Sequence, residues 1–313
     1  MQKNLWVSIS LALLLSCSQQ EKEVYLFSYF MGNGEDGLHL AYSEDGLQWT
    51  ALNDNQSFLL PTAGQDKLMR DPCIIRGGDG DFHMVWTVSW NEQGIGYAHS
   101  SDLINWSEQR YIPVMEHEPD ARNCWAPEIY YDIPSREYLI YWATTIPGRY
   151  PETDSTGDDG YNHRMYYTTT KDFQTFSETK LLFDQGFNVI DATIQHTPDE
   201  YIMFLKNEIR YPFPEKNLRI SRSQHLLGPY SEASSPISPA KVWVEGPSAV
   251  QIENGWVIYF DRYIEKRIGA IQSNDLENWT DITESMHFPE GTRHGSVFKV
   301  EQKVLDKLMN KEK

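Results

Sequence analysis

The sequence is short of positive charge. Its 313 residues contain 27 Lys and Arg against 45 Asp and Glu, which gives a net charge of −18. Proteins that bind nucleic acids contact the phosphates through clustered Lys and Arg, so this balance argues against a nucleic-acid partner. The excess of carboxylates favours solubility and suits a site built from carboxylates around a neutral substrate.

Cysteine is also scarce. The chain has only three, Cys17, Cys73 and Cys124, and no Cys/His spacing is typical of a zinc site. Cys17 follows an N-terminal apolar run, which leaves Cys73 and Cys124 as either a disulfide or two free thiols. The low cysteine count favours free thiols.

Long apolar runs are absent except at the N-terminus. After Lys3, the run "LWVSISLALLLS" (5–16) has the length of a signal peptide and is too short to span a bilayer. Its end, together with Cys17, resembles a bacterial lipobox, which is cleaved before a cysteine that then carries lipid. We therefore expect a lipoprotein signal peptide over 1–16 and a polar tether over 17–23. An ordinary signal peptide that contains a cysteine is the alternative.

This N-terminus predicts where the protein resides. An exported lipoprotein would sit at the outer membrane, at the cell surface or on its periplasmic side. No later segment is long and apolar enough to cross a bilayer, so the lipid on Cys17 would be the only membrane contact. We expect a monomer.

A repeat runs through the rest of the chain. Four copies have a strand pattern, a Ser or Thr, a turn containing Asp, an aromatic residue and another Ser or Thr, and a fifth copy is weaker. The copies are "AYSEDGLQWT" (41–50), "AHSSDLINWS" (98–107), "YTTTKDFQTFS" (167–177), "AIQSNDLENWT" (270–280) and the weaker "RISRSQHLLGPYSE" (219–232). Units of roughly 50 residues with short strands and turns are typical of β-propeller blades. The sequence therefore predicts an all-β fold, a five-bladed β-propeller with four strands in each blade.

Each blade should begin with an inner strand that lines the central channel. The candidates are "RDPCIIR" (70–76), "WAPEIYY" (125–131), "IDATIQH" (190–196), "EGPSAVQ" (245–251) and "RHGSVFK" (293–299). The last would complete the first blade beside the N-terminal strands and so close the ring and cover exposed strand edges. The propeller domain is expected over 24–300, followed by a C-terminal tail over 301–313.

Three carboxylates occur at the starts of these strands. Asp71, Asp191 and Glu245 come from three blades and should meet at one end of the channel. Like charges repel one another, so such a cluster is usually retained for function, although pairing with Arg70 or Arg293 is an alternative. Two carboxyl groups on either side of a glycosidic bond are the chemistry of glycoside hydrolysis.

In these motifs and their order, the sequence resembles glycoside hydrolase family 43, whose members are five-bladed propellers that invert the anomeric configuration. The resemblance implies that Asp71 is the general base, that Glu245 in "EGP" is the general acid, and that Asp191 raises the pKa of that acid and orients it. It covers a Trp-Ala-Pro-Glu motif that starts at Trp125, and His294, which would lie near a bound water or a metal. No cofactor is required, although a structural calcium ion in the channel is possible.

Five residues are expected to contact the sugar. Trp125 could stack on a sugar face or fill the core, and Arg262 could reach the substrate or pair with Asp261 or Glu265. Lys206 is expected to line the pocket, as are Glu208 and His294. The segment 147–163 should be an insertion that shapes the substrate cleft.

The resemblance implies a hydrolase of plant polysaccharides with an oligosaccharide or polysaccharide substrate. An α-L-arabinofuranosidase or β-xylosidase that acts on arabinan, arabinoxylan, xylan or arabinogalactan side chains is favoured. A galactan-directed member of the same family and a propeller that binds glycans without cleaving them are the alternatives. Invertase-like propellers are disfavoured because their Asn-Asp-Pro and Glu-Cys motifs are missing.

Overall fold

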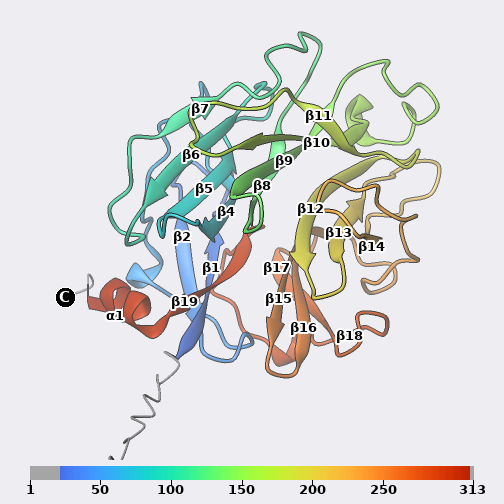
Figure 1. Ribbon diagram of the computed structural model, residues 1–313. Helices are drawn as coiled ribbons and strands as arrows, with labels where there is room; N and C mark the ends of the chain where they lie inside the picture. Colours follow the sequence, from blue (N-terminus) through green and yellow to red (C-terminus); the bar gives the residue numbers. More distant parts are fainter. Residues whose placement is uncertain (1–21, 311–313) are drawn as a thin grey trace, which may run out of the picture.

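The computed structural model of the protein describes residues 22–310, which form a ring of five antiparallel sheets (Figure 1). The first sheet has the order β19-β1-β2-β3 and the second the order β4-β5-β6-β7. The strands of these two sheets are β1 (Glu23–Tyr29), β2 (His39–Ser43), β3 (Thr50–Ala51), β19 (Ser296–Glu301), β4 (Arg70–Arg76), β5 (Phe82–Thr87), β6 (Ile95–Ser100) and β7 (Arg110–Ile112).

The other three sheets continue the ring in chain order. Their strand orders are β8-β9-β10-β11, β12-β13-β14 and β15-β16-β17-β18. The strands are β8 (Trp125–Asp132), β9 (Glu137–Thr145), β10 (His163–Thr170), β11 (Lys180–Phe183), β12 (Val189–His196), β13 (Tyr201–Asn207), β14 (Asn217–Ser223), β15 (Glu245–Ile252), β16 (Gly255–Arg262), β17 (Arg267–Ser273) and β18 (Thr280–Asp281). Five blades with four strands in nearly every one confirm the predicted β-propeller.

The ring closes between the two ends of the chain. Strand β19 pairs with β1 in antiparallel register, with Leu26 opposite Phe298, and the blue and red strands lie together in Figure 1. This confirms the predicted closure. The closing strand begins at Ser296 rather than at 293, so Arg293 and His294 lie in the segment that leads into it.

The repeated Asp turns follow one hydrogen-bonding scheme. The Oδ1 atom of Asp45 accepts hydrogen bonds from the backbone amides of Leu47 and Gln48, and also from the hydroxyl of Ser43. Asp102, Asp172 and Asp275 make the equivalent amide contacts. Because Asp replaces backbone acceptors in a tight turn, the motif fixes the turn into the outermost strand of four blades.

The fourth blade departs from the expected four strands. Among the described residues it has only β12, β13 and β14, since the segment after β14 does not form a regular ladder. Its backbone amides at Ser231, Ser234 and Ile237 bond to the carbonyls of residues 222, 220 and 218. The segment advances three residues for every two on β14, so strand pairing, which needs equal steps, is lost.

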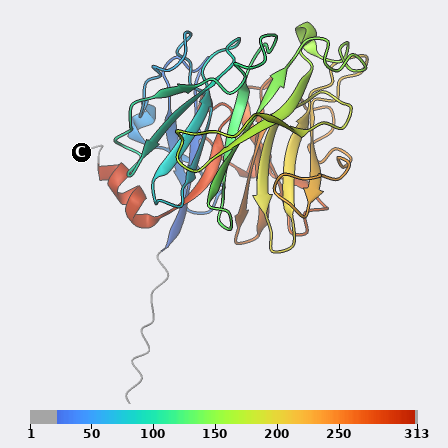
Figure 2. The ribbon, with the colours of Figure 1, turned by 45° about the horizontal axis from the view of Figure 1, so that its top comes forward.

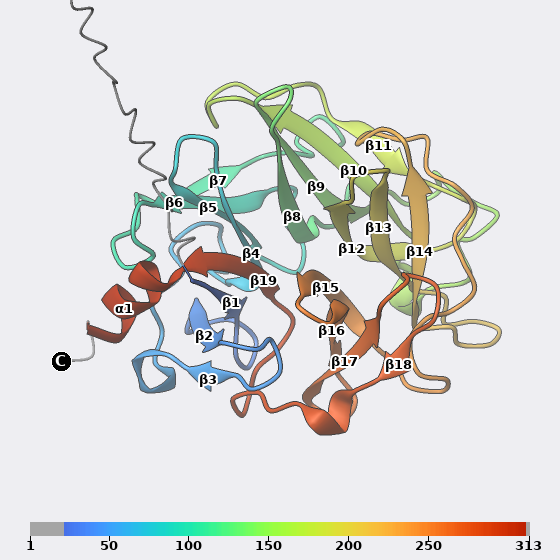
Figure 3. The same ribbon diagram turned by 60° about the horizontal axis from the view of Figure 1, so that its bottom comes forward.

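The core lies between the blades, and a short helix covers one part of it. Helix α1 (Gln302–Asn310) extends from β19 and buries Val304, Leu305 and Leu308 in the same cluster as Phe82 (Figure 3). This ordered helix occupies most of the stretch expected to be a tail. No helix among residues 22–310 is long and apolar enough to cross a membrane. The predicted signal peptide, Cys17 and nearly all of the tether lie outside the described residues.

Cys73 and Cys124 are both free and buried. They belong to one apolar cluster between the second and third blades, where burial raises the pKa of each thiol. The expectation of free thiols is therefore confirmed.

Candidate active site

A cavity of about 400 Å³ opens where the inner strands begin. Figure 2 shows the strands running between two loop-bearing faces of the ring, and the cavity lies at the face where β4, β8, β12 and β15 start. Its walls include the three predicted carboxylates, two aromatic rings and several cations. All the predicted contact residues except Arg262 are among them: Trp125, Lys206, Glu208 and His294.

A repeated backbone irregularity aims these side chains at the axis. Four inner strands carry a register shift at their first residues, where Asp71, Ala126, Asp191 and Gly246 have φ between 45° and 61°. These left-handed conformations are strained for residues other than glycine, and such strain is typical of functional sites. The bulges put Asp71 and Asp191 at equivalent positions, with Glu245 one residue earlier on its strand, as the alignment of the strands predicted.

Asp71 is held as an ionised carboxylate. Its Oδ1 lies 3.2 Å from Nδ1 of His294, and its Oδ2 accepts a hydrogen bond of 2.8 Å from the hydroxyl of Thr87. Burial alone would raise the pKa of Asp71, but the charge and hydrogen bond of His294, with help from Arg70, lower it to about 2. An ionised carboxylate with fixed neighbours can accept a proton from water.

His294 is the cationic partner of this group. Burial opposes its charge, but the surrounding carboxylates, Asp71 first, raise its pKa to about 9. No three metal-ligating side chains are grouped anywhere in residues 22–310, and a bound water or metal ion near His294 stays a prediction.

Glu245 lies between two cations at the entrance to β15. Its Oε2 is 3.5 Å from Nζ of Lys206 and its Oε1 is 3.5 Å from Nη2 of Arg293. About a quarter of the side chain is exposed to the cavity. Both separations are longer than those of close ion pairs, and the one to Lys206 is a long hydrogen bond to Oε2, so the two cations hold the carboxyl group from either side.

Asp191 contacts the strand that carries Glu245. Its Oδ2 accepts a hydrogen bond of 3.0 Å from the backbone amide of Gly246. Burial, with the charges of Glu245 and Asp71, raises the pKa of Asp191 to about 6 against the opposing effect of His294 and Lys206. The hydrogen bond gives Asp191 a means of orienting Glu245, whereas its predicted electrostatic effect on that acid stays a prediction.

A fourth carboxyl group lies deeper in the channel. The sequence singles out Glu128 only as the last residue of the Trp-Ala-Pro-Glu motif. Its Oε2 accepts hydrogen bonds from the hydroxyls of Thr193 (2.8 Å) and Tyr141 (3.2 Å). Burial raises the pKa of Glu128 to about 7. It lies two residues after Ala126 on the same strand, so it faces the channel below the cavity rather than the cavity itself.

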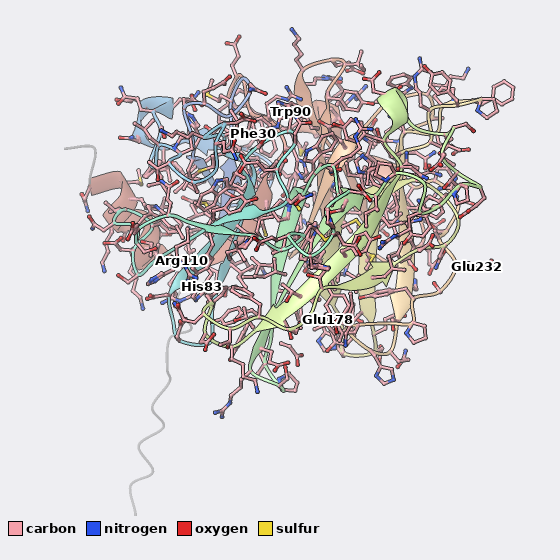
Figure 4. The ribbon with its side chains drawn as sticks, turned by 90° about the horizontal axis from the view of Figure 1, so that it is seen from above. Phe30, His83, Trp90, Arg110, Glu178 and Glu232 are labelled. Carbon is pink, nitrogen blue, oxygen red and sulfur yellow. The ribbon has the colours of Figure 1, made fainter. Side chains whose placement is uncertain are left out.

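Two tryptophans form one wall of the cavity. The rings of Trp90 and Trp125 meet edge to face at 5.4 Å, and Nε1 of Trp125 donates to the backbone carbonyl of Trp90. The guanidinium of Arg70 lies 4.2 Å from the ring of Trp90 and 4.7 Å from that of Phe30. Figure 4 shows Phe30 and Trp90 at one face of the ring and His83 towards the other. Arg70 and Trp90 both line the cavity, but they are not among the residues that the sequence predicted to contact the sugar.

The opposite wall consists of a buried charge network. Nζ of Lys206 lies 2.6 Å from Oε2 of Glu208, whose other oxygen pairs with Lys216. Lys216 also pairs with Asp158, which belongs to the predicted insertion. The segment 147–163 therefore supports this wall, while its Tyr161 packs against Trp125 at 4.6 Å. This placement agrees with an insertion that shapes the cleft.

Arg262 does not line the cavity, contrary to the expectation of a substrate contact. Its Nη2 donates to Oε1 of Glu265 at 2.6 Å, which is the salt bridge weighed as the alternative. Trp90, Lys206 and Arg262 all lie at or just after the end of a blade's second strand. Strand position therefore does not distinguish these three residues. Only side-chain packing separates Arg262 from Trp90 and Lys206, which line the cavity.

An ionised carboxylate that shares a polar and aromatic cavity with a second carboxyl group, itself flanked by cations, is the arrangement of a glycoside hydrolase. The family model described as a probable glycosyl hydrolase domain, related to glycoside hydrolase family 43, matches residues 20–306. The chain belongs to this family, which confirms the resemblance seen in its motifs.

Individual relatives are distant. An alpha-L-arabinofuranosidase of Bifidobacterium longum subsp. longum is 24% identical over an alignment of 281 residues, which covers 74% of this chain and 26% of that protein. The chain thus spans about a quarter of the length of this curated relative.

Solved structures share the fold at lower identity. An alpha-L-arabinofuranosidase from Clostridium thermocellum has a TM-score of 0.56 and 11% identity, over 83% of this chain and 89% of that chain. An exo-beta-1,3-galactanase from Phanerochaete chrysosporium has a TM-score of 0.52 and 15% identity, over 70% and 52%. At these identities the likeness shows the propeller fold alone.

Proposed function

We propose that the protein is an inverting glycosidase that releases arabinofuranosyl or xylosyl units from plant polysaccharides such as arabinan, arabinoxylan, xylan or arabinogalactan. The observation that carries the proposal is the pairing of Asp71 with His294, which keeps one carboxylate ionised in a cavity that it shares with Glu245. Membership of the family and the arabinofuranosidase relative support the choice of reaction and sugar.

In the proposed reaction, Asp71 accepts a proton from a water molecule that attacks the anomeric carbon. Glu245 donates a proton to the oxygen of the leaving group on the other side of the bond, so the configuration at that carbon inverts. Asp191 orients Glu245 through the amide of Gly246. The mechanism uses only side chains, and no step requires a calcium ion.

A galactan-directed activity is the second candidate. It is favoured by the galactanase from Phanerochaete chrysosporium among the proteins that share the fold. The two candidates differ in the sugar that the walls of the cavity accept, while the carboxylates keep the same roles.

The test is hydrolysis of arabinan, arabinoxylan, xylan, arabinogalactan and β-1,3-galactan oligosaccharides, with the released sugar identified by chromatography. Proton NMR during the first minutes should show the product in the inverted configuration. Retained configuration would overturn the mechanism, and binding without release would favour a non-catalytic glycan-binding propeller.

We further propose that the protein is exported and anchored by lipid on Cys17, and that it acts as a monomer. The lipobox-like segment supports this proposal, although it lies outside the described residues. A polysaccharide substrate outside the cytoplasm fits an anchored enzyme.

A further inference from the structure

An aromatic strip lies next to Glu245, on the side of the cavity away from the Trp90 and Trp125 wall. It consists of Tyr211, Trp243 and Tyr263, which come from the loop after β13, the segment before β15 and the loop after β16. All three loops emerge at the cavity face, because β15 begins there and β13 and β16 end there. The proposed reaction assigns none of these residues a role.

Short contacts join the strip to the acid. Tyr263 lies with its ring centroid 5.0 Å from Nζ of Lys206, the cation that is 3.5 Å from Glu245. The rings of Tyr263 and Trp243 are 6.3 Å apart, and Trp243 precedes Glu245 by two residues. The strip therefore begins beside the general acid and leads outward from the cavity.

The strip is held in place before any ligand arrives. The guanidinium of Arg210 lies 4.8 Å from the ring of Trp243 and 5.0 Å from that of Tyr211. The backbone amides of Arg210 and Tyr211 both donate to the carbonyl of Thr156 in the insertion. Rings that are already fixed lose little conformational entropy on binding, which favours affinity. Tyr211 is nevertheless 48% exposed, and Phe213 on the same loop is 81% exposed.

The charges around the strip are already paired with one another. Lys216 and Arg210 both contact Asp158, and Lys206 contacts Glu208. The cations that contact these rings are therefore neutralised by carboxylates, and the strip offers aromatic faces beside paired polar groups. Such faces suit the apolar sides of neutral sugar rings, since aromatic residues contribute large contact area with polar edges.

We propose that this strip binds the leaving-group side of a glycan chain, over two or more sugars beyond the bond that is cleaved. The inference rests on the proposed function, because a general acid must lie next to the leaving group while the base lies on the opposite face of the sugar. Glu245 is adjacent to the strip, so the chain that departs extends over Trp243 and Tyr211. The protein is thereby adapted to polymers rather than to short glycosides.

The experiment compares kcat/KM for arabino-oligosaccharides of two to six units and, in parallel, for β-1,3-linked galacto-oligosaccharides. A glycosyl fluoride, whose leaving group is a single atom, supplies the baseline that cannot reach the strip. We expect kcat/KM of the unaltered protein to rise with chain length. Trp243→Ala and Tyr211→Ala should each lower it about tenfold for the longest oligosaccharides, which corresponds to ~1.4 kcal/mol, and leave the fluoride unchanged.

Tyr201→Ala is the matched control, since Tyr201 begins β13 at the opposite face and the substitution removes the same ring. Tyr211 is exposed enough that its variant keeps the fold even if Trp243→Ala does not. If kcat/KM does not depend on chain length, or if both variants retain the dependence, the strip does not bind the glycan chain, while the proposed function still holds. Absence of hydrolysis on every substrate refutes the proposed function instead.

Discussion

Nδ1 of His294 lies 3.2 Å from Oδ1 of Asp71, so a residue from the end of the chain sets the charge of the proposed base. The contact exists because β19 closes the first blade beside β4. His294 precedes β19 in the sequence, and its side chain lines the same cavity as Asp71 on β4 and Glu245 on β15. The segment that closes the ring therefore also completes the site.

Replacing His294 should change the acid side of the pH profile. The imidazolium lowers the pKa of Asp71, so His294→Gln should let that pKa rise from about 2 towards or above its ordinary value of 3.8. The base must be ionised, so the acidic limb of kcat/KM should move to higher pH by about one to two units. Measurement from pH 2 to 8 tests this, with His196→Gln on the opposite face as the control. An unchanged limb would show that the pair does not tune the base.

Removal of either proposed proton-transfer group should nearly abolish turnover. Asp71→Asn and Glu245→Gln are expected to lower kcat on a natural oligosaccharide by roughly 10²–10⁴-fold while both variants remain folded. Activity of Glu245→Gln should be partly restored on dinitrophenyl glycosides, whose leaving group needs no proton, whereas Asp71→Asn should stay inactive. Glu253→Gln, at an exposed turn, is the control. Near-normal turnover of both site variants would refute the assignment.

Glu128 should make the protein less stable as the pH rises. Its pKa in the folded state is about 7, above the ordinary 4.5, so the folded state binds this proton more tightly than the unfolded state does. The free energy of unfolding should therefore fall between about pH 4.5 and 7. Glu128→Gln should remove this loss and be more stable than the unaltered protein at pH 8 by about 2 kcal/mol. Urea unfolding at pH 4.5 and 8 measures the difference, and equal curves at both pH values would contradict it.

Gly246 should not tolerate a side chain. Its φ is +61°, and a Cβ atom would lie 2.2 Å from Cδ2 of His294, so Gly246→Ala must displace the ring that holds Asp71. We expect at least a tenfold loss of kcat and a loss of roughly 1–3 kcal/mol in the free energy of unfolding. Gly186→Ala separates backbone strain from the clash, since Gly186 has a φ of +72° and no atom within 4 Å of the added Cβ. Equal effects of the two variants on kcat would exclude displacement of His294.

Anchorage is tested independently of catalysis. Cys17→Ala should release the protein from the membrane fraction of cells that express the full chain, because the lipid needs the cysteine sulfur. Immunoblots of membrane and soluble fractions measure this, and Ser16→Ala beside it is the control that should remain bound. Unchanged fractionation of Cys17→Ala would rule out the lipid anchor.

The sequence alone was enough to predict the blades and the column of carboxylates. Turn signals are local. In four copies an Asp accepts hydrogen bonds from the backbone amides two and three residues further on, so the repeat can be counted from the sequence. All inner strands begin at the same end of the channel, so the sequence predicts that Asp71, Asp191 and Glu245 lie together there.

The fourth strand of the fourth blade and the contact role of Arg262 could not be predicted in this way. Both depend on geometry that strand position does not specify. Residues 231–237 advance three residues for every two on β14, and the Arg262 guanidinium pairs with Glu265 instead of lining the cavity. The stacking of Arg70 between Phe30 and Trp90 likewise joins two blades.

The sequence by itself determined which groups are available for chemistry, because strand register assigns side chains to the channel by position. The tertiary structure decided their charge. His294, which approaches across the ring closure, holds Asp71 ionised against the effect of burial, with a smaller contribution from Arg70. Burial, with the charge of Asp191, raises the pKa of Glu128 to about 7. Desolvation and charge act through space, so the state of each carboxyl group follows from the closed ring.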